Sequence, residues 1–129
     1  MPWTYEQATG RLSSPCGQLA AIGYAGGNCG KNPEGKNNPD LQEKPCIGPL
    51  PQGVYTFSHT EDSPKLGPFV ILLDPDPGNE MYGRSVFRMH GDSIAHPGCA
   101  SEGCIIMPRA VREKVFASAD HTLIVVKGV

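Results

Sequence analysis

Residues 69–90, FVILLDPDPGNEMYGRSVFRMH, contain two predicted strands and the turn between them. The first five residues form a continuous apolar run, which is typical of a strand buried on both faces. The prolines and the glycine that follow end this strand. The last six residues alternate, so that Phe87 and Met89 share one face and Arg88 and His90 share the other. The stretch therefore predicts neighbouring β-strands.

Five further segments carry strand signals, which brings the expected total to six or seven strands with one helix. The segment 54–58 has the β-branched and aromatic residues that suit a pleated surface. The N-terminal segment is predicted as an edge strand followed by a turn. The five segments are 3–12, 18–24, 54–58, 104–107 and 122–126.

Outside the strands, the sequence predicts one helix and one long loop. The helix covers residues 108–118 and begins at a proline, which suits the first turn. One of its faces is apolar, and the other carries Arg109 and Arg112, which we expect to be solvated. Residues 25–52 are rich in Gly, Asn and Pro and predict a loop, either a solvated insertion or a binding loop.

Length and composition limit the class of protein. The 129 residues correspond to one domain, residues 1–129. The chain has 16 glycines and 13 prolines, which disfavour an all-helical bundle and favour a mainly-β fold with long loops. The formal net charge of −2 argues against a nucleic-acid backbone binder, which needs a basic face. No stretch approaches the roughly 18 consecutive apolar residues of a membrane helix, so we expect no membrane insertion.

The N-terminal residues 1–6 lack the basic and apolar regions of a Sec signal peptide. Three interpretations stay open at this point: a cytosolic protein, export by a route that reads no cleavable signal, or a processed form with a new initiating Met.

Five cysteines leave at least one unpaired thiol in an unmodified monomer. We expect any disulfides to exclude Cys104 and to join the other four, for which three pairings exist. The alternative is that several of these side chains are simply small buried groups. The other four are Cys16, Cys29, Cys46 and Cys99.

The candidate catalytic residues lie on both sides of a predicted loop. His90 ends one strand and Cys104 precedes the next, so the loop can bring them together. A neighbouring imidazole lowers the pKa of a thiol and makes it a nucleophile. Ser101 is predicted to bond the imidazole or the substrate, and backbone N–H groups near Gly103 are predicted to face an oxyanion. Arg88 shares the His90 face and could hold a substrate carboxylate.

These residues also allow a structural role or a metal site. Cys104 and His90 could be a structural thiol and a core histidine. A zinc site could use the pair together with His96 and Cys99, although the spacing lacks the usual paired signature. Asp92 could cap the turn after Gly91 or orient His90.

The sequence resembles the YkuD-like cysteine L,D-transpeptidases, in which a His is followed, after a spacer, by Ser/Thr-His-Gly-Cys. His90-Gly91 and Ser101-Glu102-Gly103-Cys104 match this motif, except that Glu102 replaces a His. The Arg that often follows the Cys is also absent. The whole segment also resembles the Tlde1-type domain, an L,D-transpeptidase-related effector domain of bacterial type VI secretion. Similar blocks occur at residues 5–12, 23–26 and 48–55.

The resemblance implies a compact YkuD-like β-sandwich or partly open barrel. It also implies a reaction on the peptide stem of Gram-negative peptidoglycan, without a metal or another cofactor. Cys104 would attack the L-centre carbonyl of meso-diaminopimelate and release D-Ala, with His90 as base and then acid. The expected catalytic residues are Cys104, His90 and Ser101. The expected substrate-binding or oxyanion residues are Gly103, Arg88, Gly91 and Asp92.

The same resemblance implies type VI delivery without a cleavable signal peptide, action in the periplasm of a target cell, and a cognate immunity protein. Two other classes of protein stay open. One is a different cysteine amidase or endopeptidase of the cell wall, although such enzymes normally place the Cys before the His. The other is a non-catalytic, disulfide-stapled secreted binding module.

Overall fold

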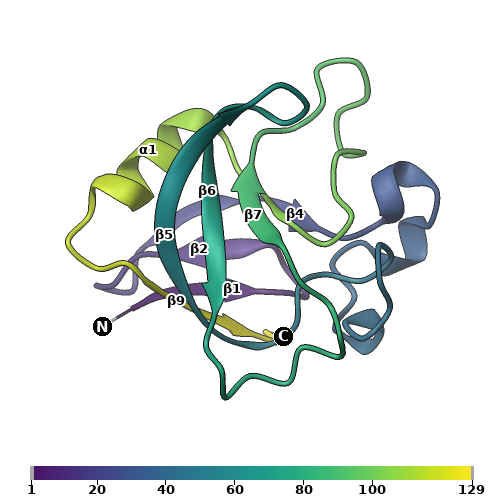
Figure 1. Ribbon diagram of the computed structural model, residues 1–129, viewed down its shortest axis with the longest axis horizontal. Coiled ribbons are helices and arrows are strands. Elements are labelled where there is room, and N and C mark those ends of the chain that lie inside the picture. Colours follow the sequence, from purple (N-terminus) through teal and green to yellow (C-terminus); the bar gives the residue numbers. More distant parts are fainter. Residues whose placement is uncertain (1, 129) are drawn as a thin grey trace.

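The computed structural model describes residues 2–128, and these residues form a mainly-β fold with one α-helix (Figure 1). The predicted class is therefore confirmed. The strands are β1 (Trp3–Glu6), β2 (Arg11–Ser13), β3 (Leu19–Ile22), β4 (Tyr24–Ala25), β5 (Gly53–Ser63), β6 (Gly67–Pro75), β7 (Phe87–His90), β8 (Ile105–Ile106) and β9 (Thr122–Val126). The helices are η1 (Asn28–Gly30), η2 (Pro33–Gly35) and η3 (Pro39–Leu41), which are short 3₁₀ turns, and α1 (Arg109–Ala117).

All nine strands belong to one sheet in the order β3-β2-β1-β9-β5-β6-β7-β8-β4. The pairs β1–β9 and β7–β8 are parallel, and the other pairs are antiparallel. The predicted edge position of the N-terminal strand is wrong, because β1 pairs with β2 on one side and with β9, from the other end of the chain, on the other side. The prediction of six or seven strands is also too low, since turns at Gly10 and Gly23 each divide one predicted segment into two strands.

The sheet curls into a partly open barrel, as expected. Its two edge strands, β3 and β4, are consecutive in the chain and are separated only by Gly23. The Gly23 N–H donates to the Gly10 carbonyl at 2.8 Å. A β-carbon at Gly23 would lie 1.9 Å from the Ile106 carbonyl oxygen, so only glycine lets the chain cross here. The two edges therefore meet at a tight backbone crossing, without a ladder that would close the barrel.

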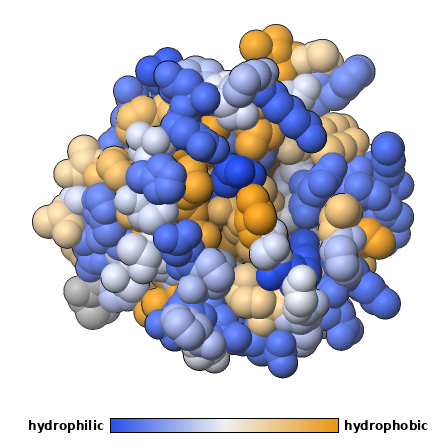
Figure 2. All heavy atoms as spheres, in the orientation of Figure 1, coloured by the Kyte–Doolittle hydropathy of each residue, from blue (hydrophilic) through white to orange (hydrophobic). Residues whose placement is uncertain are grey.

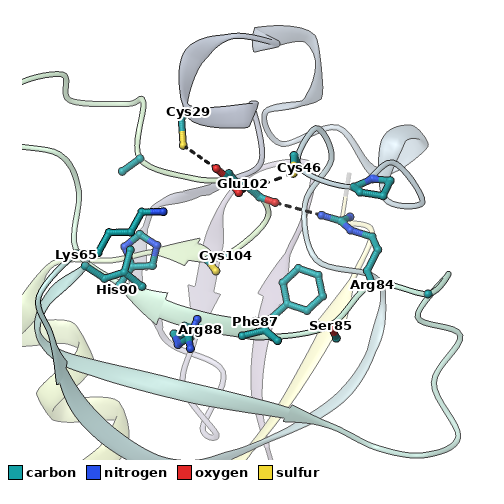
Figure 3. Close-up of a pocket in the computed structure, with 15 residues that line it drawn as sticks. Cys29, Cys46, Lys65, Arg84, Ser85, Phe87, Arg88, His90, Glu102 and Cys104 are labelled. Carbon is teal, nitrogen blue, oxygen red and sulfur yellow. Dashed lines mark hydrogen bonds between the residues drawn. The ribbon is translucent and has the colours of Figure 1, made fainter.

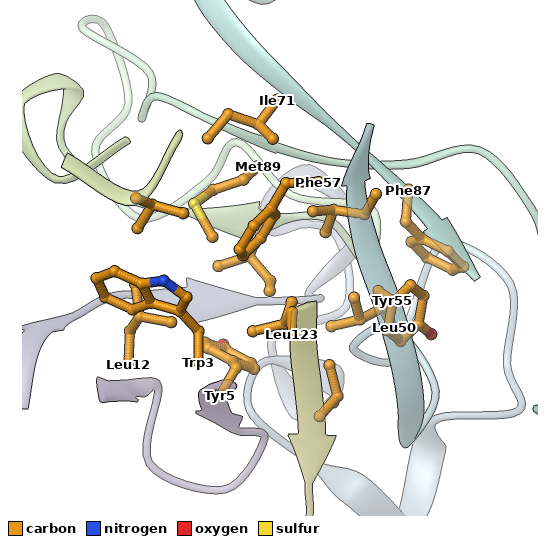
Figure 4. Packing of buried hydrophobic residues seen from close by; sticks show 14 of the residues in the cluster. Trp3, Tyr5, Leu12, Leu50, Tyr55, Phe57, Ile71, Phe87, Met89 and Leu123 are labelled. Carbon is orange, nitrogen blue, oxygen red and sulfur yellow. The ribbon is translucent and has the colours of Figure 1, made fainter. Parts of the chain in front are cut away.

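The core fills the inside of this curled sheet (Figure 4). Trp3, Tyr5 and Leu123 are fully buried there, and Phe57 and Met89 pack from the opposite strands. The expected burial of β6 on both faces is confirmed at its centre, because the successive residues Val70 and Ile71 are both fully buried. Helix α1 packs against β6, and its Val115 belongs to the buried core cluster.

Arg112 in α1 corrects one prediction. Its side chain was expected to be solvated, but it is buried, and its guanidinium donates to the carbonyl oxygens of Pro68, Phe69 and Met107. These carbonyls lie where β6 begins and β8 ends. One planar guanidinium can satisfy several such acceptors at once. Arg109 is exposed, as predicted, and lies 3.8 Å from the Glu113 carboxylate.

Candidate active site

A cavity of about 420 Å³ opens beside the neighbouring strands β7 and β8 (Figure 3). The loop of residues 25–52 contributes one wall, the turn before β7 contributes another, and the β5–β6 connection contributes Lys65. Figure 2 shows hydrophilic and hydrophobic residues interspersed over one face of the molecule. The cysteines, the charged residues, the histidine and the aromatic residue that line the cavity are Cys29, Cys46, Lys65, Arg84, Phe87, Arg88, His90, Glu102 and Cys104.

The parallel pairing of β7 with β8 brings Cys104 and His90 to this one cavity. Met89 pairs with Ile105 and His90 with Ile106, so Cys104 comes directly before the paired stretch. The His90 Nδ1 atom lies 2.9 Å from the Gly91 carbonyl oxygen. A carbonyl only accepts, so Nδ1 carries the proton and Nε2 keeps a lone pair. Within residues 2–128 no hydrogen bond joins this ring to the thiol; such contacts often tighten only with substrate.

Burial sets the protonation of both groups. Burial raises the pKa of the Cys104 thiol, and the Arg88 backbone and side chain only partly oppose this effect. Burial also lowers the pKa of His90, and the nearby Arg112 and Arg88 charges act in the same direction. The resting pair is therefore a neutral thiol and a neutral imidazole. Both shifts favour the uncharged forms, and activation of Cys104 by His90 stays a prediction.

Ser101 does not reach the cavity, which corrects its predicted contact with the imidazole or the substrate. The side chain is fully buried. Its Oγ accepts from the N–H groups of Gly26 at 2.8 Å and Gly103 at 3.0 Å, and it donates to the Cys104 carbonyl at 2.6 Å. Ser101 thus positions the segment before Cys104 against the start of the 25–52 loop.

Replacing Ser101 with alanine is expected to destabilise the fold by about 2–4 kcal/mol, because two buried N–H groups and one carbonyl lose their partner. Urea denaturation monitored by circular dichroism measures this difference. The matched control is Ser85→Ala at an exposed position, which should change the free energy of unfolding by less than about 0.5 kcal/mol. Equal effects of the two variants would contradict the positioning role.

Close packing around Gly103 leaves no room for a side chain. Its φ is +129°, and a β-carbon there would lie 2.5 Å from Arg84 Nη2 and 2.9 Å from Phe87 Cε1. Its N–H is already donated to Ser101 Oγ. The Gly103 N–H is therefore already engaged in this conformation, and the oxyanion role of the backbone N–H groups around Cys104 stays a prediction.

Arg88 lies beside the thiol, as its strand position predicts. Its Nε is 3.4 Å from Glu61 Oε1, but the atom makes no hydrogen bond of good geometry and is buried. Arg88 also lines the cavity, together with Cys104. The positive charge also favours ionisation of Cys104.

Gly91 and Asp92 line a second cavity of about 660 Å³, which shares His90 and Lys65 with the first. Asp92 accepts from the Tyr24 hydroxyl at 2.5 Å and from the N–H groups of Ser93 and Gly98. Two roles were predicted for Asp92, and these bonds support the first, a cap of the 93–98 turn. The hydrogen bonds that Asp92 makes within residues 2–128 do not include the His90 ring.

Arg84 is the functional-site residue that sequence reasoning missed. The side chain is buried, and its guanidinium donates to the carbonyls of Gln42, Gly48, Pro49 and Glu102. It also lies 5.1 Å from the centre of the Phe87 ring. Arg84 thus links the 25–52 loop to the segment that carries Cys104. No local pattern signals this role, because the acceptors are backbone groups from distant parts of the chain.

The alternative zinc site has no geometric counterpart in residues 2–128, where no three His, Cys, Asp or Glu side chains are arranged to hold a metal ion. In the same residues no helix has both the length and the apolar character needed to cross a bilayer.

Comparison with known proteins identifies the family. A family model described as the Tlde1 domain matches residues 25–127, which include both walls of the cavity and the segment from His90 to Cys104. Searches of curated proteins and of solved structures returned no match. The match covers most of the chain and supports the resemblance seen in the sequence. The chain belongs to the Tlde1 domain family, a family of type VI secretion effectors.

Proposed function

We propose that this effector is a cysteine L,D-carboxypeptidase that acts on the stem peptide of Gram-negative peptidoglycan. The observation that supports the proposal most directly is the parallel pairing of β7 with β8, which brings His90 and Cys104, the residue just before β8, to one cavity. The family membership supports an effector that is delivered into target cells. A substrate in peptidoglycan places its action in the periplasm and requires an immunity protein in the producing cell.

The proposed reaction begins with attack of the Cys104 sulfur on the L-centre carbonyl of meso-diaminopimelate. His90 Nε2 accepts the thiol proton as the carbon–sulfur bond forms. The tetrahedral intermediate then expels the amine of the terminal D-Ala, which takes that proton from the imidazolium. Water attacks the thioester, again with His90 as base, and releases the tripeptide stem and the thiol.

Arg88 is the proposed anchor for the terminal carboxylate of the stem. Arg88 and Cys104 line the same cavity, and the Arg88 Nε lies 3.4 Å from Glu61 Oε1, so a substrate carboxylate would share the guanidinium with Glu61. A carboxylate that accepts from a guanidinium is held with defined orientation. Binding there would keep the scissile amide near Cys104 Sγ.

The function is tested by incubating the protein with purified peptidoglycan and separating the muropeptides by liquid chromatography with mass detection. We expect tetrapeptide stems to be converted to tripeptide stems with release of free D-Ala. Release of stems from the glycan, or cleavage of cross-links without loss of D-Ala, would instead indicate the amidase or endopeptidase class. Unchanged muropeptides from a folded, reduced protein would favour a binding module.

Exchange of the terminal D-amino acid is the second candidate activity, and the second cavity favours it. This cavity adjoins the first at His90, so an acceptor amine in it could reach the same thioester. Adding D-methionine to the muropeptide assay tests the idea. Stems that end in D-methionine are expected if the cavity admits an acceptor, and only tripeptide stems are expected if water alone does.

The pH dependence follows from the neutral resting pair. His90 must be unprotonated to accept the thiol proton, and burial lowers its pKa below the usual value of 6.5. We therefore expect kcat/KM to fall only below pH 6.5, as His90 becomes protonated. Between pH 6.5 and neutrality, kcat/KM should not change with pH. Rates of D-Ala release across pH values measure this profile. Arg109→Gln, on the exposed face of α1, should leave the acid limb unchanged, whereas an acid limb centred above 6.5 would contradict a buried neutral base.

A further inference from the structure

We propose that Cys29 and Cys46 form a disulfide across the mouth of the cavity when the protein meets a disulfide oxidant. Both thiols line the cavity and bind the same carboxylate (Figure 3). Cys29 Sγ lies 3.6 Å from Glu102 Oε1, and Cys46 Sγ lies 3.7 Å from Glu102 Oε2. The inference rests on this arrangement and does not depend on the proposed reaction.

The backbone directs both thiols toward this point. Cys29 has a φ of +53° and Cys46 a φ of +67°, a region that residues with a β-carbon rarely adopt. Such conformations persist only where the surrounding structure holds them. The Cys29 N–H, for example, donates to the Ser101 carbonyl at 2.9 Å. The two cysteines are thus held at the ends of segment 30–45, with their side chains on one carboxylate.

Exposure makes the pair accessible to an oxidant, since both residues are exposed. The remaining cysteines are placed differently. Cys16 lies in the β2–β3 turn, where its Sγ is 3.1 Å from Ser14 Oγ. Cys104 lines the cavity and is only partly exposed, unlike Cys29 and Cys46.

Cys99 is the competing partner for Cys29. A β-carbon at Gly30 would lie 2.9 Å from Cys99 Sγ, so this thiol packs against the residue next to Cys29. The Cys29 side chain, however, points to Glu102, where Cys46 also points (Figure 3). This direction is the reason to assign Cys46 as the partner.

The chemistry is a thiol–disulfide exchange with a low-molecular-weight disulfide such as oxidised glutathione. One protein thiol loses its proton, and its sulfur attacks the oxidant to form a mixed disulfide and release one glutathione thiol. The second protein thiol then attacks the mixed disulfide and releases the other. Two protein S–H bonds are replaced by one S–S bond, and the oxidant is reduced to two thiols.

Oxidation would have two structural consequences. Segment 30–45 would become a closed ring, which limits the freedom of the unfolded chain. The Glu102 carboxylate would lose both thiol donors and would be free to face the cavity. An effector carried from a reducing cytosol to an oxidising compartment would thus gain a covalent tie at its cavity mouth on arrival.

The test uses the full chain with Cys16→Ser, so that residues 12–31 contain only one cysteine. The protein is treated with oxidised glutathione, remaining thiols are blocked with iodoacetamide, and tryptic peptides are analysed without reduction. We expect a cross-link between residues 12–31 and 37–65, with loss of two hydrogens. Recovery of both thiols in alkylated form, or a cross-link from residues 12–31 to residues 89–109, would overturn the proposal.

Thermal unfolding provides a second measurement. Oxidation of the natural chain and of Cys16→Ser is expected to raise Tm by roughly 10 °C. The rise should vanish in Cys29→Ser and in Cys46→Ser, and reduction with dithiothreitol should reverse it. A rise that persists in Cys46→Ser would contradict the assigned pairing.

Discussion

Cys104→Ala is expected to lower the rate of stem trimming by more than about 10⁴-fold, because the proposed reaction has no other nucleophile. The thiol lines the cavity and is half-buried, so its loss should leave the fold almost unchanged. Release of D-Ala from purified peptidoglycan measures the rate, and circular dichroism monitors the fold.

The matched control is Cys16→Ala, which removes an exposed thiol from the β2–β3 turn and should trim stems at the wild-type rate. Cys104→Ala that still converts tetrapeptide to tripeptide stems would show that the nucleophile is misassigned. A Cys104→Ala variant that unfolds at a much lower temperature than the wild type would instead indicate that Cys104 is a structural thiol.

Arg84→Ala should have the largest effect on stability. The guanidinium satisfies four backbone carbonyls, and its removal leaves them without a donor in a largely buried site. A loss of about 3–5 kcal/mol is expected. Arg84→Lys should recover only part of it, because an ammonium cannot reproduce the planar fork of donors. Urea denaturation measures all three proteins.

Arg109→Ala is the control for this prediction, since Arg109 is exposed and forms an ion pair with Glu113 one helical turn away. Such a pair contributes less than about 0.5 kcal/mol. If Arg84→Ala and Arg109→Ala unfold at the same urea concentration, the four carbonyl contacts of Arg84 do not stabilise the fold. Because Arg84 also bonds the Glu102 carbonyl, Arg84→Ala should reduce trimming as well as stability.

The strands show how far local patterns extend. The alternation in residues 85–90 correctly predicts that Phe87 and Met89 enter the core. The pattern of residues 3–12 does not reveal that β1 is interior, because its second neighbour is β9, more than a hundred residues away. A period of two depends on the residues of one strand, whereas strand order depends on which distant segments pair.

The site residues divide in the same way. The motif of His90 and Cys104 is local, and the structure places both at one cavity. Ser101 belongs to the same motif, yet its hydroxyl accepts from the backbone N–H of Gly26, which is 75 residues away in the chain. The motif predicts that Ser101 contacts the imidazole or the substrate, because no residue near Ser101 in the chain indicates that Gly26 is its partner.

By itself, the sequence determined the mainly-β class, the family resemblance and the candidate pair of Cys104 and His90, since each depends on residues that are close along the chain. Only the tertiary structure decided that Ser101, Arg84 and Arg112 serve backbone groups rather than substrate or solvent. The physical reason is that burial and hydrogen-bond partners arise from contacts between distant segments. A polar side chain shows its role only when those segments have folded around it.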